Sequence, residues 1–309
     1  MDPRTQLVVV TGKGGVGKTV LTAAVGRILA GRGRTVLLLE ADPRENLHHL
    51  FGTDPSGGAV VAAAPGIALQ NVSPRAIMDA VVRHALRVGA LSRRVLGSPI
   101  YQHFAEAAPG LKEMMLLGYA LQVVEGDADH RSDVVVLDAP ASGHGLSLLA
   151  APLLVSDVIG TGPIGAMASR IARHVADPAT CAIVLVTVAE EMPIQETLET
   201  AAELRQRLGR EPTLVVANQV WPALDPSPGA AALPDARDAV ALWETRRRLN
   251  ERELERLAAQ WSGPTAQVPL SGAEFGPDLL VAVADALAPQ LPGADGASAP
   301  PTRKGTRRA

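Results

Sequence analysis

A glycine-rich string between a short apolar run and a helical pattern constrains this sequence more than any other feature. The apolar run covers Leu7–Val10, and the helical pattern covers Lys18–Ala30. The string consists of Gly12, Lys13, Gly14, Gly15, Val16, Gly17, Lys18 and Thr19. It fits the spacing G-x-x-x-x-G-K-[ST], in which backbone N–H groups curl around phosphates at a helix N-terminus. The strand–loop–helix context predicts a phosphate-binding loop instead of an ordinary glycine turn.

The end of the string supplies the side chains that a nucleoside triphosphate needs. Lys18 can reach the β and γ phosphates, where it would both bind and stabilise the reacting group. The hydroxyl of Thr19 can coordinate Mg²⁺ directly. We therefore expect ATP and Mg²⁺ as the bound groups.

Short apolar runs alternate with longer helical patterns along most of the chain. The expected strands are Leu7–Val10, Thr35–Leu39, Val134–Leu137, Ala182–Val186, Leu214–Ala217 and Gln267–Leu270. These runs are almost continuously apolar, so helices should cover both faces of the sheet. The expected helices include Lys18–Ala30, Pro193–Leu208, Asp238–Gln260 and Pro277–Leu287. The pattern predicts an α/β fold with a doubly wound, mostly parallel sheet.

One long interval interrupts this alternation and suggests how the chain is divided. Residues 46–132 contain helical patterns at Pro74–Val88 and Leu111–Val124, with a single strand pattern at Ala68–Val72. We expect this interval to be a mostly helical insertion subdomain. Residues 1–45 and 133–291 would form the ATPase domain. Residues 292–309 are rich in Gly, Ala and Pro and then basic, which predicts a disordered tail.

Composition excludes several classes of protein. The 29 basic and 32 acidic side chains give a net charge of -3, and aromatic residues make up 3%. We therefore expect no nucleic-acid partner, which would need a basic or stacking surface. The single cysteine, Cys181, excludes a Cys-rich zinc site or a cysteine-ligated iron–sulfur cluster within one chain. With no export signal or membrane span, we expect a cytoplasmic protein that reaches a membrane only through a partner.

Two aspartates follow predicted strands and add to the phosphate site. Asp42 comes shortly after Thr35–Leu39, and Asp138 comes directly after Val134–Leu137. Ligands of open α/β sheets bind at the carboxyl ends of the strands, where both residues fall. Asp138 has the form of a Walker B acid that holds Mg²⁺ through water, and Asp42 could polarise the attacking water. An aspartate after a strand can also be a simple cap or turn residue.

The string and three later segments resemble the ArsA family of deviant Walker A ATPases in its single-loop form. Lys13 is the early lysine of that class. Asp42 and Asn46 match the first switch motif of the family. Asp138, Gly143 and His144 match the second. Residues around Glu190, then Asn218, and finally Pro269 and Leu270 resemble the segments that contact the nucleotide, with Asn218 at adenine.

The resemblance implies a mechanism in which two chains cooperate. Lys13 would cross the interface to the nucleotide held by the partner, so Lys13, Lys18 and Asp42 would be catalytic. The partner would be a second copy or a paralogous ATPase. The loops at Asp42, Asn46, Asp138, Gly143 and His144 would switch with the γ phosphate. Relatives deliver tail-anchored membrane proteins, which implies an apolar helix client or a membrane-protein partner.

Three other functions are compatible with parts of the sequence. A partitioning or positioning ATPase of the ParA or MinD kind shares the loop, but such proteins need a basic face or a basic amphipathic helix. A subunit of an arsenite-type anion efflux system shares the family, but the sequence contains one cysteine. A binding module with an inactive site is the third. In the insertion, Met78, Met114 and Met115 could line a client groove, although a packed helical face is the interpretation we favour.

Overall fold

The computed structural model describes residues 1–42, 44–86, 98, 110–139, 145–159, 162–224 and 234–291. Its centre is an eight-stranded sheet in the order β3-β4-β2-β5-β1-β6-β7-β8. The strands are β1 (Leu7–Gly12), β2 (Val36–Glu40), β3 (Val61–Ala64), β4 (Ile67–Asn71), β5 (Val134–Asp138), β6 (Cys181–Val188), β7 (Leu214–Val220) and β8 (Thr265–Pro269). Only the edge pair β3–β4 is antiparallel. The predicted mostly parallel α/β sheet is therefore confirmed.

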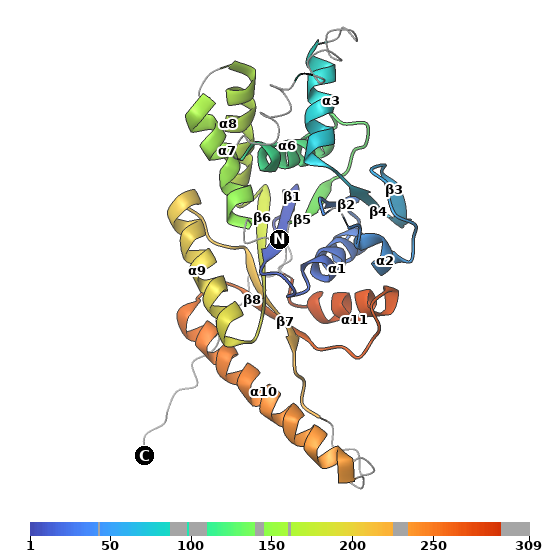
Figure 1. Cartoon of the computed structure of the whole chain (residues 1–309), viewed down its shortest axis with the longest axis vertical. Helices are drawn as coiled ribbons and strands as arrows, with labels where there is room; N and C mark the ends of the chain where they lie inside the picture. Colours follow the sequence, from blue (N-terminus) through green and yellow to red (C-terminus); the bar gives the residue numbers. More distant parts are fainter. Residues whose placement is uncertain are drawn as a thin grey trace.

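Helices cover both faces of this sheet, as the continuous apolar runs predict. Val8, Val10 and Leu38 point to one face, whereas Val9 and Leu39 point to the other. The first face packs against α1 (Lys18–Gly31), α2 (Leu47–Phe51) and α11 (Pro277–Leu287). The second packs against α3 (Pro74–Leu86), α6 (Leu111–Glu125), α7 (Gly145–Ile159), α8 (Gly162–Ala176) and α9 (Glu191–Leu208). Figure 1 shows these two groups of helices on opposite sides of the strands.

The interval 46–132 differs from the expected helical insertion because it contributes two strands to the main sheet. β4 pairs in parallel with β2, and β3 adds the antiparallel edge. The residues of β3 are mostly alanine, which favours strands only weakly, and none of them is buried. We retain the division into residues 1–45 with 133–291 and residues 46–132 as a proposal.

Two helices between β5 and β6 were not predicted. α7 is apolar on nearly all sides and contains Pro152, so it has no amphipathic period. α9 begins at Glu191, two residues before the expected start at Pro193. α10 (Pro234–Gln260) begins before the expected Asp238. Figure 1 shows that the amino-terminal half of α10 extends away from the sheet.

The methionines of the insertion are part of the packed core in this structure. Met78, Met114 and Met115 are buried, and they belong to the cluster that covers the second face of the sheet. The packed-face interpretation of these residues therefore agrees with the structure. Among the described residues, none of the helices combines the length and apolar character needed to cross a bilayer.

The central strand β2 offers a test of the core. Leu38 is fully buried and packs on α1 at Gly26. We predict that Leu38→Ala lowers the free energy of unfolding by about 2–5 kcal/mol, because it leaves a cavity that the helix cannot fill. The change in Leu242→Ala, at an exposed position of α10, should stay within about 0.5 kcal/mol. Urea denaturation followed by circular dichroism measures both, and equal losses would contradict this packing.

Candidate nucleotide-binding site

The loop between β1 and α1 lies close against the sheet and contains two left-handed glycines. A Cβ at Gly12 would overlap the carbonyl oxygen of Val186 in β6. Gly15 and Gly17 have φ values of 83° and 88°, which L side chains rarely adopt. Gly17 is also the N-cap of α1, and no side chain caps the helix there. The first N–H groups of α1 can therefore bind an anion.

Lys18, the first residue of α1, is largely buried and spans the loop. Its Nζ donates a hydrogen bond to the carbonyl oxygen of Lys13, 2.9 Å away. Burial lowers the pKa of Lys18, and the nearby carboxylate of Asp138 opposes that shift. A positive charge in such surroundings is screened less than on the surface, so it attracts a phosphate strongly.

A cavity of about 290 Å³ brings the loop together with distant parts of the sequence. Its lining consists of Gly15, Gly17, Lys18, Thr19, Val20, Glu40, Asp42, Asn46, Asp138, Ala139 and Phe275. A larger hollow of about 570 Å³ lies between the first half of the loop, α7 and α9. Its lining lacks Lys18, Thr19 and both aspartates. The smaller cavity therefore has the chemistry of a triphosphate site.

Thr19 and Asp138 lie in contact, as a shared metal site requires. The Thr19 hydroxyl donates to Oδ2 of Asp138 at 2.6 Å, and Thr22 donates to Oδ1 at 3.3 Å. Burial raises the pKa of Asp138 to about 6. Mg²⁺ is usually held by one or two protein oxygens, with waters and phosphate oxygens completing an octahedron. One hydroxyl and one carboxylate fit that need, and no cluster of three acidic, His or Cys ligands occurs in the described ranges.

Asp42 and residues 44–47, which together we call the switch segment, border the same cavity through Asp42 and Asn46. Asp42 accepts a hydrogen bond from the backbone N–H of Arg44 at 2.8 Å, so its carboxylate is held within the turn. The side chain of Asn46 donates to the carbonyl oxygen of Arg44 and to Glu40. Both predicted switch residues of this segment therefore lie at the cavity wall.

Lys13 lies apart from this cavity. Its Nζ forms an ion pair with Oε1 of Glu196 in α9 at 2.6 Å, and both side chains are exposed. Lys13 lines the larger hollow and not the cavity that contains Lys18. The two lysines of the loop therefore point toward different spaces.

The residues expected to contact the base of the nucleotide lie at or near the carboxyl ends of β6, β7 and β8. Glu190 follows β6, Asn218 lies in β7 and Pro269 ends β8. Asn218 is buried and donates to the carbonyl oxygen of Val16 in the loop at 2.9 Å. Leu270 donates its backbone N–H to Val220 at 2.8 Å. None of these four residues lines the 290 Å³ cavity.

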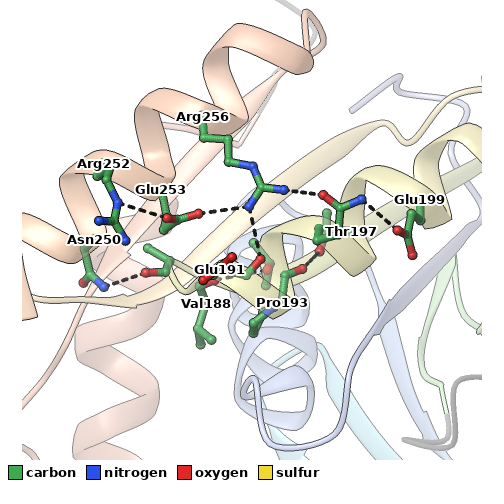
Figure 2. Close-up of polar contacts among 12 residues, drawn as sticks. Val188, Glu191, Pro193, Thr197, Glu199, Asn250, Arg252, Glu253 and Arg256 are labelled. Carbon is green, nitrogen blue, oxygen red and sulfur yellow. Dashed lines mark hydrogen bonds and ion pairs between the residues drawn. The ribbon is translucent and has the colours of Figure 1, made fainter.

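A polar network around the buried Asn250 and Glu253 holds the segment after β6 against α10 (Figure 2). Asn250 donates to the carbonyl oxygen of Ala189 at 2.7 Å and accepts the N–H of Trp221 at 2.9 Å. Arg256 donates to Glu191 and Gln195, and it is paired with the buried Glu253. The network fixes the backbone on both sides of Glu190.

Glu40, Asn71 and Asn250 all contact predicted site segments, although no pattern in the sequence indicated them. Glu40 follows an apolar run and Asn250 lies in a highly charged helix, so neither residue stands out by its neighbours. The predicted switch residues Gly143 and His144 lie outside the described residues. The assignment of roles to the other site residues stays a prediction.

The fold and the site together define a P-loop nucleotide hydrolase with a second, early lysine in the loop. Residues 5–169 match the family model of the anion-transporting ATPases, ArsA. The chain belongs to this family and is an ATP hydrolase.

Individual relatives agree with this family. The ATPase BagA of Mycobacterium tuberculosis is 31% identical over 242 residues, which is 76% of this chain and 71% of BagA. An arsenical pump-driving ATPase of Acidiphilium multivorum is 26% identical over 253 residues, 76% of this chain and 41% of that protein. The ATPase GET3C of Arabidopsis thaliana is 27% identical over 156 residues, 46% of this chain and 40% of GET3C.

Two glycines of the loop provide a matched test of its geometry. A Cβ at Gly17 would overlap the side-chain amide of Asn218, whereas a Cβ at Gly15 would meet open space. Both positions have left-handed backbone, so each alanine should cost about 1–2 kcal/mol in strain. We predict that only Gly17→Ala also displaces Asn218 and destabilises the fold further. Urea denaturation compares the two variants, and equal stability would contradict the close approach.

Proposed function

We propose that two chains of this ATPase meet at the carboxyl edges of their sheets and enclose two Mg·ATP between them. The second chain is an identical copy or a paralogue. The observation that carries this proposal is the divergence of the two loop lysines. Lys18 lines the triphosphate cavity, whereas Lys13 is exposed beside a different hollow. The exposed position of Lys13 suits a phosphate that another subunit presents.

The residues of the cavity would divide the work of hydrolysis. The loop N–H groups and Lys18 bind the phosphates. Thr19 would hold Mg²⁺ directly and Asp138 through water, and the ion would neutralise charge on the phosphate oxygens when bound. Asp42 orients the attacking water, whose oxygen bonds to the γ phosphorus as the bond to ADP breaks. Asn218, Glu190, Pro269 and Leu270 contact the base and ribose.

The ion pair with Glu196 would allow Lys13 to move to the phosphate of a partner chain. Exposed ion pairs contribute only about 0–1 kcal/mol, so Lys13 can exchange Glu196 for a phosphate at small cost. In the closed dimer Lys13 would neutralise the charge that develops on the partner's nucleotide, in the manner of an arginine finger. Release of the γ phosphate would remove that contact and let the subunits separate.

The work of the cycle would be to open and close a surface for a client or partner. Leu154 and Val158 of α7 lie one turn apart, and both are exposed apolar side chains. Such a pair suits an apolar helix or a membrane-protein partner better than water. With no spanning helix in the described ranges, we propose a cytoplasmic ATPase that meets membranes through this partner.

A subunit of an anion efflux system is the second candidate, because one relative is named an arsenical pump-driving ATPase. Cys181 is fully buried and burial raises its pKa to about 11. The thiolate that binds soft ions is therefore disfavoured at this position. A positioning ATPase of the ParA or MinD kind gains no specific support, because the net charge is -3.

A mixing experiment tests whether Lys13 acts on the partner's nucleotide. We predict that Lys13→Ala and Asp42→Asn each lower turnover by about 10³-fold or more. A mixed dimer contains one Lys13→Ala chain and one Asp42→Asn chain. One of its sites then combines the intact Asp42 of the first chain with the intact Lys13 of the second. Equal mixing should therefore restore up to about a quarter of wild-type turnover, since half of the random dimers are mixed and each has one complete site. Phosphate release measures the recovery.

Light scattering of the same mixtures provides the control. Wild-type protein with Mg²⁺ and a non-hydrolysable ATP analogue should have twice the mass of the chain. Dimers without any recovery of turnover on mixing would show that Lys13 serves its own chain. A single-chain mass at saturating analogue would contradict the dimer itself.

A further inference from the structure

Three neighbouring strands end in a row of polar residues at the edge of the sheet. Glu40 ends β2 and lies in register with Asn71 of β4 on one side and Asp138 of β5 on the other. Asp138 belongs to the proposed metal site. Asn71 and Glu40 have no role in the mechanism described above, although Glu40 is 3% exposed and lines the triphosphate cavity.

Glu40 binds the far end of the switch segment. Its two carboxylate oxygens accept the backbone N–H of Asn46 at 3.1 and 3.0 Å, and Oε2 accepts that of Leu47 at 3.4 Å. The side-chain amide of Asn46 adds a contact at 3.4 Å. One buried side chain therefore satisfies two successive backbone donors that would otherwise lie unpaired in the protein.

Asn71 binds the near end of the same segment. Its side-chain amide donates to the carbonyl oxygen of Asp42 at 2.7 Å. The switch segment is thus attached at both ends to adjacent strand ends of the rigid sheet. The carboxylate of Asp42 belongs to the residue that Asn71 holds, and it lies at the wall of the cavity.

Burying the carboxylate of Glu40 to support a loop costs free energy. Burial disfavours the charged form and raises the pKa of Glu40 to about 7, although the N–H groups of Asn46 and Leu47 oppose that shift. An apolar side chain would fill the same volume without this penalty, but it could not hold two N–H groups. The buried position of Glu40 therefore indicates that this side chain holds the loop and does not merely fill the core.

We propose that Glu40 is a positioning residue for ATP hydrolysis, which holds the switch segment through Asn46 and Leu47 so that Asp42 faces the γ phosphate. This role rests on the proposed function of Asp42. Glu40 itself would not touch the reacting atoms. Its removal should therefore affect the chemical step much more than the binding of ATP, which depends on the loop and Lys18.

Steady-state hydrolysis by the full chain tests this role. Glu40→Ala should lower kcat about 100-fold, because small displacements of a catalytic group have effects of that size. The KM for Mg·ATP should change by less than about threefold. Glu40→Gln retains an acceptor oxygen in the same place and should lose less turnover than Glu40→Ala. An unchanged kcat, or a rise in KM as large as the fall in kcat, would overturn the proposal.

Trypsin offers a readout of the loop that does not depend on turnover. Arg44 is an exposed cleavage site within the switch segment. We expect cleavage after Arg44 to become about tenfold faster in Glu40→Ala, since the segment then opens locally. Asp133→Asn is the control, because the exposed Asp133, directly before β5, also accepts a backbone N–H, that of Thr35 directly before β2, but at the opposite edge of the sheet. It should leave kcat and this cleavage within twofold of wild type, and a change as large as that of Glu40→Ala would argue against a specific effect.

A double variant separates this proposal from the role of Asp42. If Glu40 acts through Asp42, adding Glu40→Ala to Asp42→Asn should lower kcat by less than about threefold more. Fully additive losses would overturn the positioning role. Wild-type turnover of Asp42→Asn alone would instead remove Asp42 from the proposed function. A loss in Asp42→Asn with none in Glu40→Ala would overturn only the role of Glu40.

Discussion

The parallel register of four strands determines where the polar groups of the site lie. β4, β2, β5 and β1 are aligned so that Asn71, Glu40 and Asp138 form one row, with the glycine loop directly beyond β1. β2 and β5 are apolar up to Glu40 and Asp138, and the polar Gln70 of β4 already binds Gly58 and Tyr119, so these residues offer no competing partner. Thr19 and the switch segment therefore bind to the strand ends. The chemistry of the edge follows from the packing of the sheet.

The features predicted from sequence are those with a strong local signal. The apolar runs predicted the central strands, and the glycine string predicted the loop and the helix after it. β3 escaped prediction because it consists mostly of alanine, which favours strands only weakly, and because Pro65 and Gly66 follow it directly. Glu40 and Asn250 escaped because hydropathy predicts that charged and amide side chains are exposed. Only the three-dimensional structure shows that these two are buried against backbone donors and acceptors.

The two lysines of the loop differ in environment as well as in direction. Lys18 is buried, so its charge acts over a short distance with little screening. Lys13 is exposed and its pair with Glu196 is weakly held. A buried lysine suits the permanent binding of phosphate within one chain. An exposed lysine suits a contact that forms and breaks during a cycle.

The attachment of α10 has a mechanical consequence. Asn250 connects this helix to the ends of β6 and β7, and the helix continues for sixteen residues from Asn250 back to Pro234. At 1.5 Å per residue, this outer part is a lever arm about 24 Å long. A rotation of about 10° at its pivot would displace the tip by about 4 Å. Small rearrangements at the ends of β6 and β7 would thereby be magnified at a distant point of the molecule.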